Sequence, residues 1–131
     1  MRSGYEYKIR DWLDEQSIDY EYEKLVLEYT STVRGGICTE CGGKKVGKKR
    51  KYTPDFVITR NDYSELIVEA KGRFTSADRS KMRDVRKAHP NRDIRMLFQN
   101  RYGKAKQDCI AWCEKNSFDY AFGIEVPSSW L

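Results

Sequence analysis

The stretches Tyr52-Thr53-Pro54-Asp55-Phe56 and Val68-Glu69-Ala70-Lys71-Gly72 decide the fold that the sequence predicts. Each belongs to an apolar run of strand type, and the short polar segment between the two runs favours a hairpin. Side chains of a strand alternate between its two faces, so Glu69 and Lys71 should point to the same side. Asp55, at the start of the neighbouring strand, is expected to bring a second carboxylate to that place.

Two carboxylates and one ammonium group at one place are what metal-dependent hydrolysis of a phosphodiester requires. Asp55 and Glu69, with the backbone carbonyl of Ala70, would supply the oxygen ligands that one or two Mg²⁺ ions prefer. Lys71 would orient the attacking water or neutralise charge in the transition state. The alternative is a set of solvated charges, because Glu-x-Lys alone is common; joined to Pro-Asp in apolar strands, it favours a nuclease.

A third carboxylate, Glu6, has two interpretations. It follows Ser3 by three residues, which is the spacing of a capping box at the start of a helix. It also borders the apolar stripe of that helix, from which it could point at the sheet. Spacing alone favours the cap.

The hydrophobic pattern predicts an α/β fold, with a mixed β-sheet flanked by helices and no second domain. Helices are expected at about 4–16, 76–88 and 104–115, and strands at about 18–29, 52–59, 65–70, 94–98 and 120–124. The strand at 18–29 changes phase midway, which suggests a bulge. The chain therefore reads as one domain, 1–131, with a Cys/Gly/Lys-rich bridge or hairpin insertion at about 31–51.

Composition bounds the class of protein. A chain of 131 residues has room for one domain with a core, and its net charge of +5 favours an anionic partner such as nucleic acid. It contains no apolar run long enough for a membrane span and no signal-peptide pattern at its start. We expect a protein of the cytoplasm, where its four cysteines act as metal ligands or core thiols rather than disulfides.

Cys38 and Cys41, in a Cys-x-x-Cys-Gly-Gly turn, have the spacing of half a structural zinc site. Zinc and a free-thiol turn remain equal alternatives here. Cys109 and Cys113, or the same pair from a second subunit, would complete four ligands. For Cys109 and Cys113 themselves, helix core is the preferred interpretation.

A basic run ends this insertion and predicts a phosphate-binding surface. Clustered cations are usually a solvated loop, but beside a nuclease centre they should gather DNA backbone without reading its sequence. Arg73 would extend this surface. The cations of the run are Lys44, Lys45, Lys48, Lys49, Arg50 and Lys51.

The chain resembles the phage endonuclease I family over almost its whole length. The segments that carry the resemblance are Arg2-Ser3-Gly4-Tyr5-Glu6, Tyr20-Glu21-Tyr22-Glu23 and the two stretches around Asp55 and Glu69. The family comprises enzymes that resolve four-way (Holliday) junctions, within the PD-(D/E)xK nuclease superfamily. The resemblance implies a restriction-endonuclease-like core of αβββαβ order and a homodimer that nicks branched DNA with Mg²⁺ or Mn²⁺ in a bacterial host cell.

Carried over residue by residue, the resemblance implies that Glu6, Asp55, Glu69 and Lys71 are catalytic, with Glu6 contributing to the metal site. Arg2 and Ser3 become candidate phosphate contacts. In the family, subunits exchange strands and the glutamate of the first helix serves the other subunit. The connection at about 31–51 is longer here and contains cysteines, so it could fold back as a hairpin instead.

Two alternatives remain open. A homing or restriction-type endonuclease on the same fold would cut linear duplex at a defined sequence. A non-catalytic zinc-containing DNA-binding module would bind DNA without cutting it.

Overall fold

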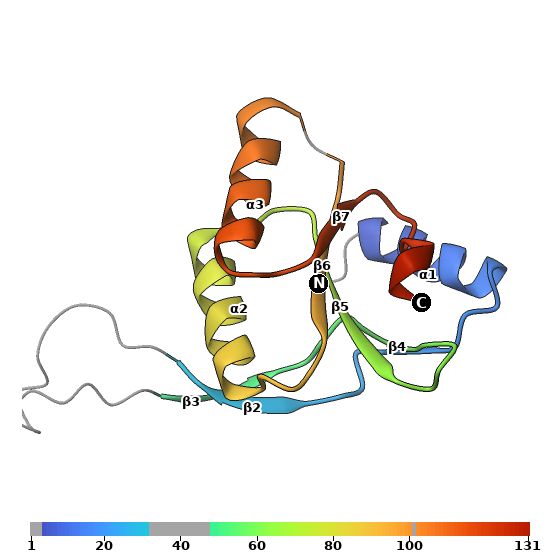
Figure 1. The fold of residues 1–131 in the computed structure, drawn as a ribbon, viewed down its shortest axis with the longest axis horizontal. Helices are drawn as coiled ribbons and strands as arrows, with labels where there is room; N and C mark the ends of the chain where they lie inside the picture. Colours follow the sequence, from blue (N-terminus) through green and yellow to red (C-terminus); the bar gives the residue numbers. More distant parts are fainter. Residues whose placement is uncertain (1–3, 32–47, 101) are drawn as a thin grey trace, which may run out of the picture.

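The computed structural model describes residues 4–31, 48–100 and 102–131 and contains a five-stranded sheet with helices on both faces (Figure 1). The elements are, in chain order, α1 (Gly4–Glu15), β1 (Tyr20–Tyr22), β2 (Leu27–Thr30), β3 (Lys49–Tyr52), β4 (Phe56–Thr59), β5 (Glu65–Lys71), α2 (Ser76–Ala88), β6 (Ile94–Phe98), α3 (Gly103–Lys115), β7 (Tyr120–Phe122) and the 3₁₀ helix η1 (Ser128–Trp130). The predicted mixed α/β class is confirmed, although the described chain has more strands than expected.

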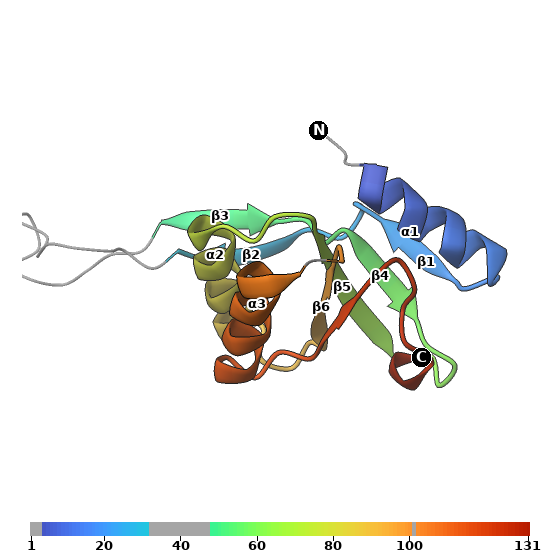
Figure 2. The same ribbon diagram turned by 90° about the horizontal axis from the view of Figure 1, so that it is seen from above.

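The sheet has the order β1-β4-β5-β6-β7 and is antiparallel on one side of β5 and parallel on the other. Helix α2 connects β5 to β6, and α3 connects β6 to β7. A parallel pair of strands needs such a long crossover, because the second strand must start from the same end of the sheet as the first. Side chains alternate between the two faces of the sheet, so the hydrophobic core consists of two clusters. One cluster lies under α2 and α3, and the other lies under α1 and η1, on the opposite face (Figure 2).

The expectation of one strand at 18–29 with a bulge is wrong. β1 joins the main sheet, whereas β2 pairs with β3 in a separate two-stranded ribbon. Glu23, just after β1, has a left-handed backbone with φ of 52°, which turns the chain out of the sheet. The change of phase in the sequence therefore marks a change of sheet.

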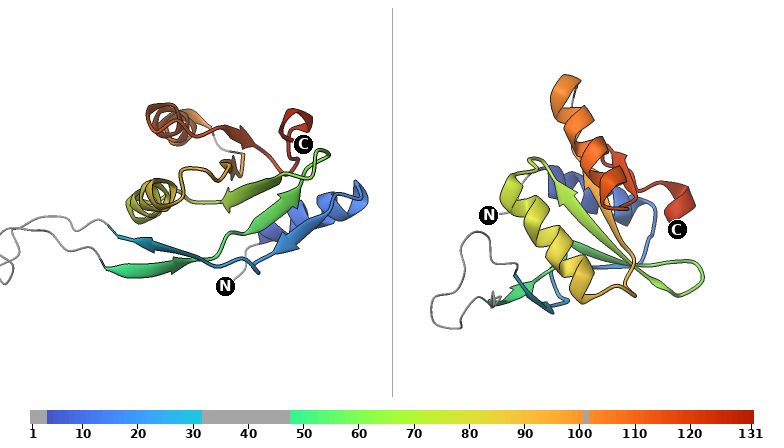
Figure 3. Two further views of the ribbon diagram at one scale, coloured as in Figure 1. Left: turned by 60° about the horizontal axis from the view of Figure 1, so that its bottom comes forward. Right: turned by 60° about the vertical axis from the view of Figure 1, so that its left-hand side comes forward.

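The strand expected at 52–59 is also divided. Tyr52 ends β3 in the ribbon, and Phe56 begins β4 in the main sheet. Pro54 lies between them and has no N–H to donate to a sheet, so pairing stops there. Figure 3 shows the ribbon continuing away from the main sheet, and its strand β2 packs against α2.

Other predicted features of the fold agree with the structure. The predicted hairpin forms between β4 and β5, with Phe56 opposite Val68. Helix α2 matches the expected bounds, since Thr75 and Asp78 form a capping box at its start. Cys109 and Cys113 are buried in the core, as expected.

The insertion expected at about 31–51 is described only at its ends. Ser31 N–H donates a hydrogen bond of 2.8 Å to the carbonyl of Lys48 across the ribbon. The predictions for Cys38, Cys41, Lys44 and Lys45 concern residues outside the described ranges, as do those for Arg2 and Ser3. Within the described ranges, no helix has the length and apolar character needed to cross a membrane.

Candidate active site

Asp55 occupies the corner between the ribbon and the main sheet. Its Oδ2 accepts a 2.8 Å hydrogen bond from the backbone N–H of Ala70, which fixes the carboxylate against β5. Burial raises the pKa of Asp55 to about 9, and the neighbouring charges of Glu69 and Glu6 add to the shift. A buried carboxyl group with other carboxylates beside it is a candidate for a functional site.

Two further carboxylates meet Asp55. Oxygen atoms of Glu6, Glu23 and Asp55 all lie within 4.8 Å of one another. Glu6 comes from the first turn of α1, where its Oε1 accepts a hydrogen bond of 3.3 Å from the Tyr22 hydroxyl. Glu23 N–H donates to the backbone carbonyl of Asp55 at 3.1 Å, so the turn after β1 is tied to the same corner.

Glu69 and Lys71 point to the same side of β5, as their spacing predicted, and form an ion pair there. Lys71 Nζ lies 3.1 Å from Glu69 Oε2, and Tyr52 OH donates to Glu69 Oε1 at 2.7 Å. Glu69 is only 3% exposed, which is unusual for a carboxylate and consistent with its two partners. Asp78 at the start of α2 places a second carboxylate 3.4 Å from Lys71 Nζ.

Lys71 is held as a cation. Burial lowers its pKa, but the charges of Glu69 and Asp78 outweigh burial, and the net shift is upward. In these surroundings the ammonium group can neutralise charge or position a polar ligand, whereas a role as base would require a further positive charge nearby.

The predicted catalytic residues therefore converge, but in a different grouping from the one expected. Register places Phe56 opposite Val68, which brings the preceding Asp55 to the carboxyl end of β5 beside Glu69. Asp55 is grouped most tightly with Glu6 and Glu23, while Glu69 is engaged by Tyr52 and Lys71. Ligation by the backbone carbonyl of Ala70 stays a prediction.

Sequence reasoning missed Glu23 as a site residue. Strand alternation through Tyr20-Glu21-Tyr22-Glu23 places Glu21 and Glu23 together on a solvated face. The left-handed turn at Glu23 removes it from that alternation. No local pattern indicated a role for Glu23. The available signal was that Glu23 belongs to Tyr20-Glu21-Tyr22-Glu23, one of the segments that carry the family resemblance.

This group of carboxylates fits a hard divalent cation. Asp55, Glu6 and Glu23 supply oxygen atoms close enough to share one ion, and oxygen is the ligand type that Mg²⁺ and Mn²⁺ take. Burial is the main cause of the raised pKa of Asp55, and a cation at this place would relieve the smaller part of the shift that comes from the charges of Glu69 and Glu6.

The described part of the predicted DNA-binding surface lies on the ribbon. Lys48, Lys49, Arg50 and Lys51 are all exposed there, and Arg73 is exposed just beyond β5. The ribbon joins the candidate active site directly, because Tyr52 at the end of β3 carries the hydroxyl that binds Glu69.

Comparison with known proteins identifies the family of this chain and two relatives. The family model described as phage endonuclease I matches residues 1–131. The chain is similar to Endonuclease I of Escherichia phage T7, with 28% identity over 135 residues that cover 100% of this chain and 78% of that protein. It is also similar to Endodeoxyribonuclease 1 of Enterobacteria phage T3, with 28% identity over 125 residues that cover 92% of this chain and 70% of that protein.

Proposed function

This chain belongs to the phage endonuclease I family, and on that premise we propose that it is a structure-selective DNA endonuclease that nicks four-way junctions and other branched DNA. The names of two relatives, Endonuclease I and Endodeoxyribonuclease 1, support cleavage of DNA. The net charge of +5 supports an anionic substrate.

One observation carries the proposal: the carboxylates of Glu6, Glu23 and Asp55 meet within 4.8 Å beside the Glu69–Lys71 ion pair. This set contains oxygen ligands for a divalent cation and a fixed ammonium group, which together can act on a phosphodiester. Burial and, to a smaller extent, the charges of Glu69 and Glu6 raise the pKa of Asp55, so a bound cation would stabilise the ionised group.

Each residue has a distinct role in the proposed mechanism. Asp55, Glu6 and Glu23 would hold a Mg²⁺ or Mn²⁺ ion, with Glu69 as a further ligand, since a carboxylate oxygen accepts more than one contact. When bound, such an ion would supply Lewis acidity at the scissile phosphate and would lower the pKa of a coordinated water. Lys71 holds its protons at Nζ and stabilises the negative charge that develops on the phosphate. Tyr52 fixes Glu69 through its hydroxyl.

We propose a homodimer, because two such centres would make paired nicks in one junction. In the described chain Glu6 lies beside Asp55 of the same chain. Mixing the Glu6→Gln and Asp55→Asn variants tests whether Glu6 also serves a partner. Recovery of cleavage in the mixture requires strand exchange, since only then does a mixed dimer contain one intact centre.

A structural zinc site at Cys38 and Cys41 is a separate proposal. Metal analysis of the purified protein and of a Cys38→Ser variant tests it: stoichiometric zinc that is lost in the variant supports the site, and its absence from both proteins refutes it.

The function is tested by incubating the protein with Mg²⁺, a four-way junction and linear duplexes of the same arm sequences. Preferential nicking of the junction is the expected result. Cleavage of one duplex sequence would indicate a homing or restriction-type enzyme, and binding without cleavage would indicate a DNA-binding module. Glu69→Gln should abolish cleavage and leave junction affinity nearly unchanged, because phosphate contacts elsewhere hold the DNA.

A further inference from the structure

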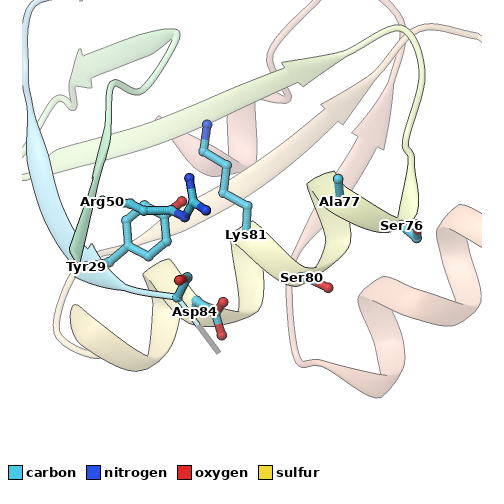
Figure 4. A pocket seen from close by; sticks show the side chains of 8 residues that line it. Tyr29, Arg50, Ser76, Ala77, Ser80, Lys81 and Asp84 are labelled. Atoms are coloured by element: carbon cyan, nitrogen blue, oxygen red, sulfur yellow. The ribbon is translucent and has the colours of Figure 1, made fainter. Parts of the chain in front are cut away.

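A pocket of about 610 Å³ lies between the β2–β3 ribbon and the first turns of α2, outside the carboxylate group (Figure 4). Tyr29 and Arg50 line it from the ribbon, and Ser76, Ser80 and Lys81 line it from α2. Its volume is in the range of roughly 300–1,000 Å³ that is typical of pockets for small ligands. The pocket can therefore accept more than a single small ion.

The register of the ribbon selects one cation for this pocket. Arg50 pairs with Tyr29, and directly opposite residues of an antiparallel pair project to the same face. Tyr29 is buried in the core under α2, so Arg50 also faces α2. Its neighbours Lys49 and Lys51 alternate to the other face of the ribbon. Arg50 thus faces the pocket, whereas Lys49 and Lys51 face away from it.

Lys81 supplies the second cation from the opposite wall. Its Nζ lies 5.2 Å from the centroid of the Tyr52 ring, a cation–π contact that holds the ammonium group over the aromatic face. Figure 4 shows Lys81 and Asp84, the acidic residue of the lining, directed towards different ends of the pocket. The ammonium end of Lys81 is therefore separated from the carboxylate.

The other lining groups suit a phosphodiester. Ser76 and Ser80 carry hydroxyl groups that can donate hydrogen bonds. The start of α2 is already capped by Thr75 and Asp78, so the candidate donors are the two hydroxyl groups rather than the helix end. Among the residues that the structure describes, the charged groups of the lining are Arg50, Lys81 and Asp84, which together give it a net positive charge.

The pocket is connected to the candidate active site through one side chain. The ring of Tyr52 contacts Lys81, and its hydroxyl donates to Glu69 at 2.7 Å. The pocket and the candidate active site are therefore separated by a single buried side chain.

We propose that the pocket is a second backbone-binding subsite, in which Arg50 and Lys81 bind a phosphate of the same DNA molecule away from the scissile bond. This inference rests on the proposed function. Its recognition is electrostatic and independent of base sequence, so it contributes affinity and register on the strand rather than sequence specificity.

Binding of a catalytically inactive Glu69→Gln protein to a labelled four-way junction, measured by fluorescence anisotropy over a range of salt concentrations, tests the proposal. Adding Arg50→Gln or Lys81→Gln should weaken binding by about 10-fold and reduce the salt slope by about one for each residue. Lys81→Arg should restore most of the affinity, because it retains the charge. Lys115→Gln, an exposed cation at the end of α3, is the matched control and should leave the affinity unchanged.

The outcomes separate this inference from the proposed function. If the parent protein binds the junction but the pocket variants bind as the Lys115→Gln control does, the subsite is refuted while nuclease function stands. If the parent protein does not bind DNA, both proposals fail. Thermal melting of each variant identifies any loss of folding. If Lys81→Gln does not fold, Arg50→Gln, at an exposed strand position, still tests the proposal.

Discussion

Replacing Asp55 by asparagine should stabilise the metal-free protein while abolishing its response to Mg²⁺. The ordinary pKa of this carboxyl is 3.8, and burial next to other carboxylates raises it to about 9 in the folded chain. An acid whose pKa rises on folding destabilises the native state once the pH exceeds the unfolded value. Asparagine carries no charge, and its oxygen can still accept the hydrogen bond from Ala70 N–H.

The magnitude follows from the two pKa values. At pH 7 the unfolded chain has released a proton that the folded chain retains, which over about 3 pH units amounts to about 4 kcal/mol. Rearrangement of the carboxylates and entry of water reduce this upper bound. We expect a gain of about 1–3 kcal/mol, equivalent to an increase in Tm of roughly 3–10 °C for a domain of this size.

Thermal unfolding followed by circular dichroism, with EDTA or with millimolar Mg²⁺, measures the effect. The penalty is absent below about pH 4 and grows as the pH rises towards about 9, so the advantage of Asp55→Asn in EDTA should increase across that window. Mg²⁺ should stabilise the wild-type protein and leave the variant nearly unchanged. Asp11→Asn, at an exposed position on α1, is the control for loss of one carboxylate. A variant no more stable than wild type in EDTA at any pH would refute the electrostatic account of this site.

Three further predictions concern the supports of the fold and the site. Tyr52→Phe leaves buried Glu69 without its hydroxyl donor. We expect the free energy of unfolding, measured by denaturant titration, to fall by about 1–2 kcal/mol and DNA cleavage to become slower. An unchanged cleavage rate would contradict the positioning role of the hydroxyl. Asp93 loses solvation on burial, but hydrogen bonds from two arginines outweigh this and lower its pKa, so Asp93→Asn should cost up to about 1 kcal/mol at neutral pH. That cost should vanish as the pH falls below the ordinary value of 3.8, and a constant difference in melting temperature down to the acid range would argue against the pairing. Thr75→Ala removes the side-chain cap of α2 and should lower stability by about 1 kcal/mol, whereas Thr75→Ser should preserve it.

Much of the fold could be predicted because its signals are local. The start of α2 is set by a capping box, and its end by His89-Pro90, both of which act within one turn of helix. The hairpin of β4 and β5 follows from two apolar runs around a short polar turn. Its register brings Asp55 to the part of β5 that carries Glu69, as the hairpin pattern predicted, although the tightest group of carboxylates is that of Glu6, Glu23 and Asp55.

Other features depended on partners distant in the chain. The phase change in residues 18–29 was visible in the sequence, but whether it meant a bulge or a second sheet was decided by packing against α1 on one side and α2 on the other. The same choice placed the ribbon beside α2 and created the pocket of Arg50 and Lys81.

The sequence by itself determined the mixed α/β class, the bounds of α2 and the pairing of Glu69 with Lys71, because periodicity, capping and two-residue alternation act between near neighbours. Only the tertiary structure decided that Glu6 and Glu23 join Asp55, since one comes from a helix and the other from a left-handed turn. Neither position is constrained by strand alternation. Their convergence results from the burial of α1 against the sheet. The hydrophobic free energy of that burial depends on residues far apart in the chain, so no local pattern predicts it.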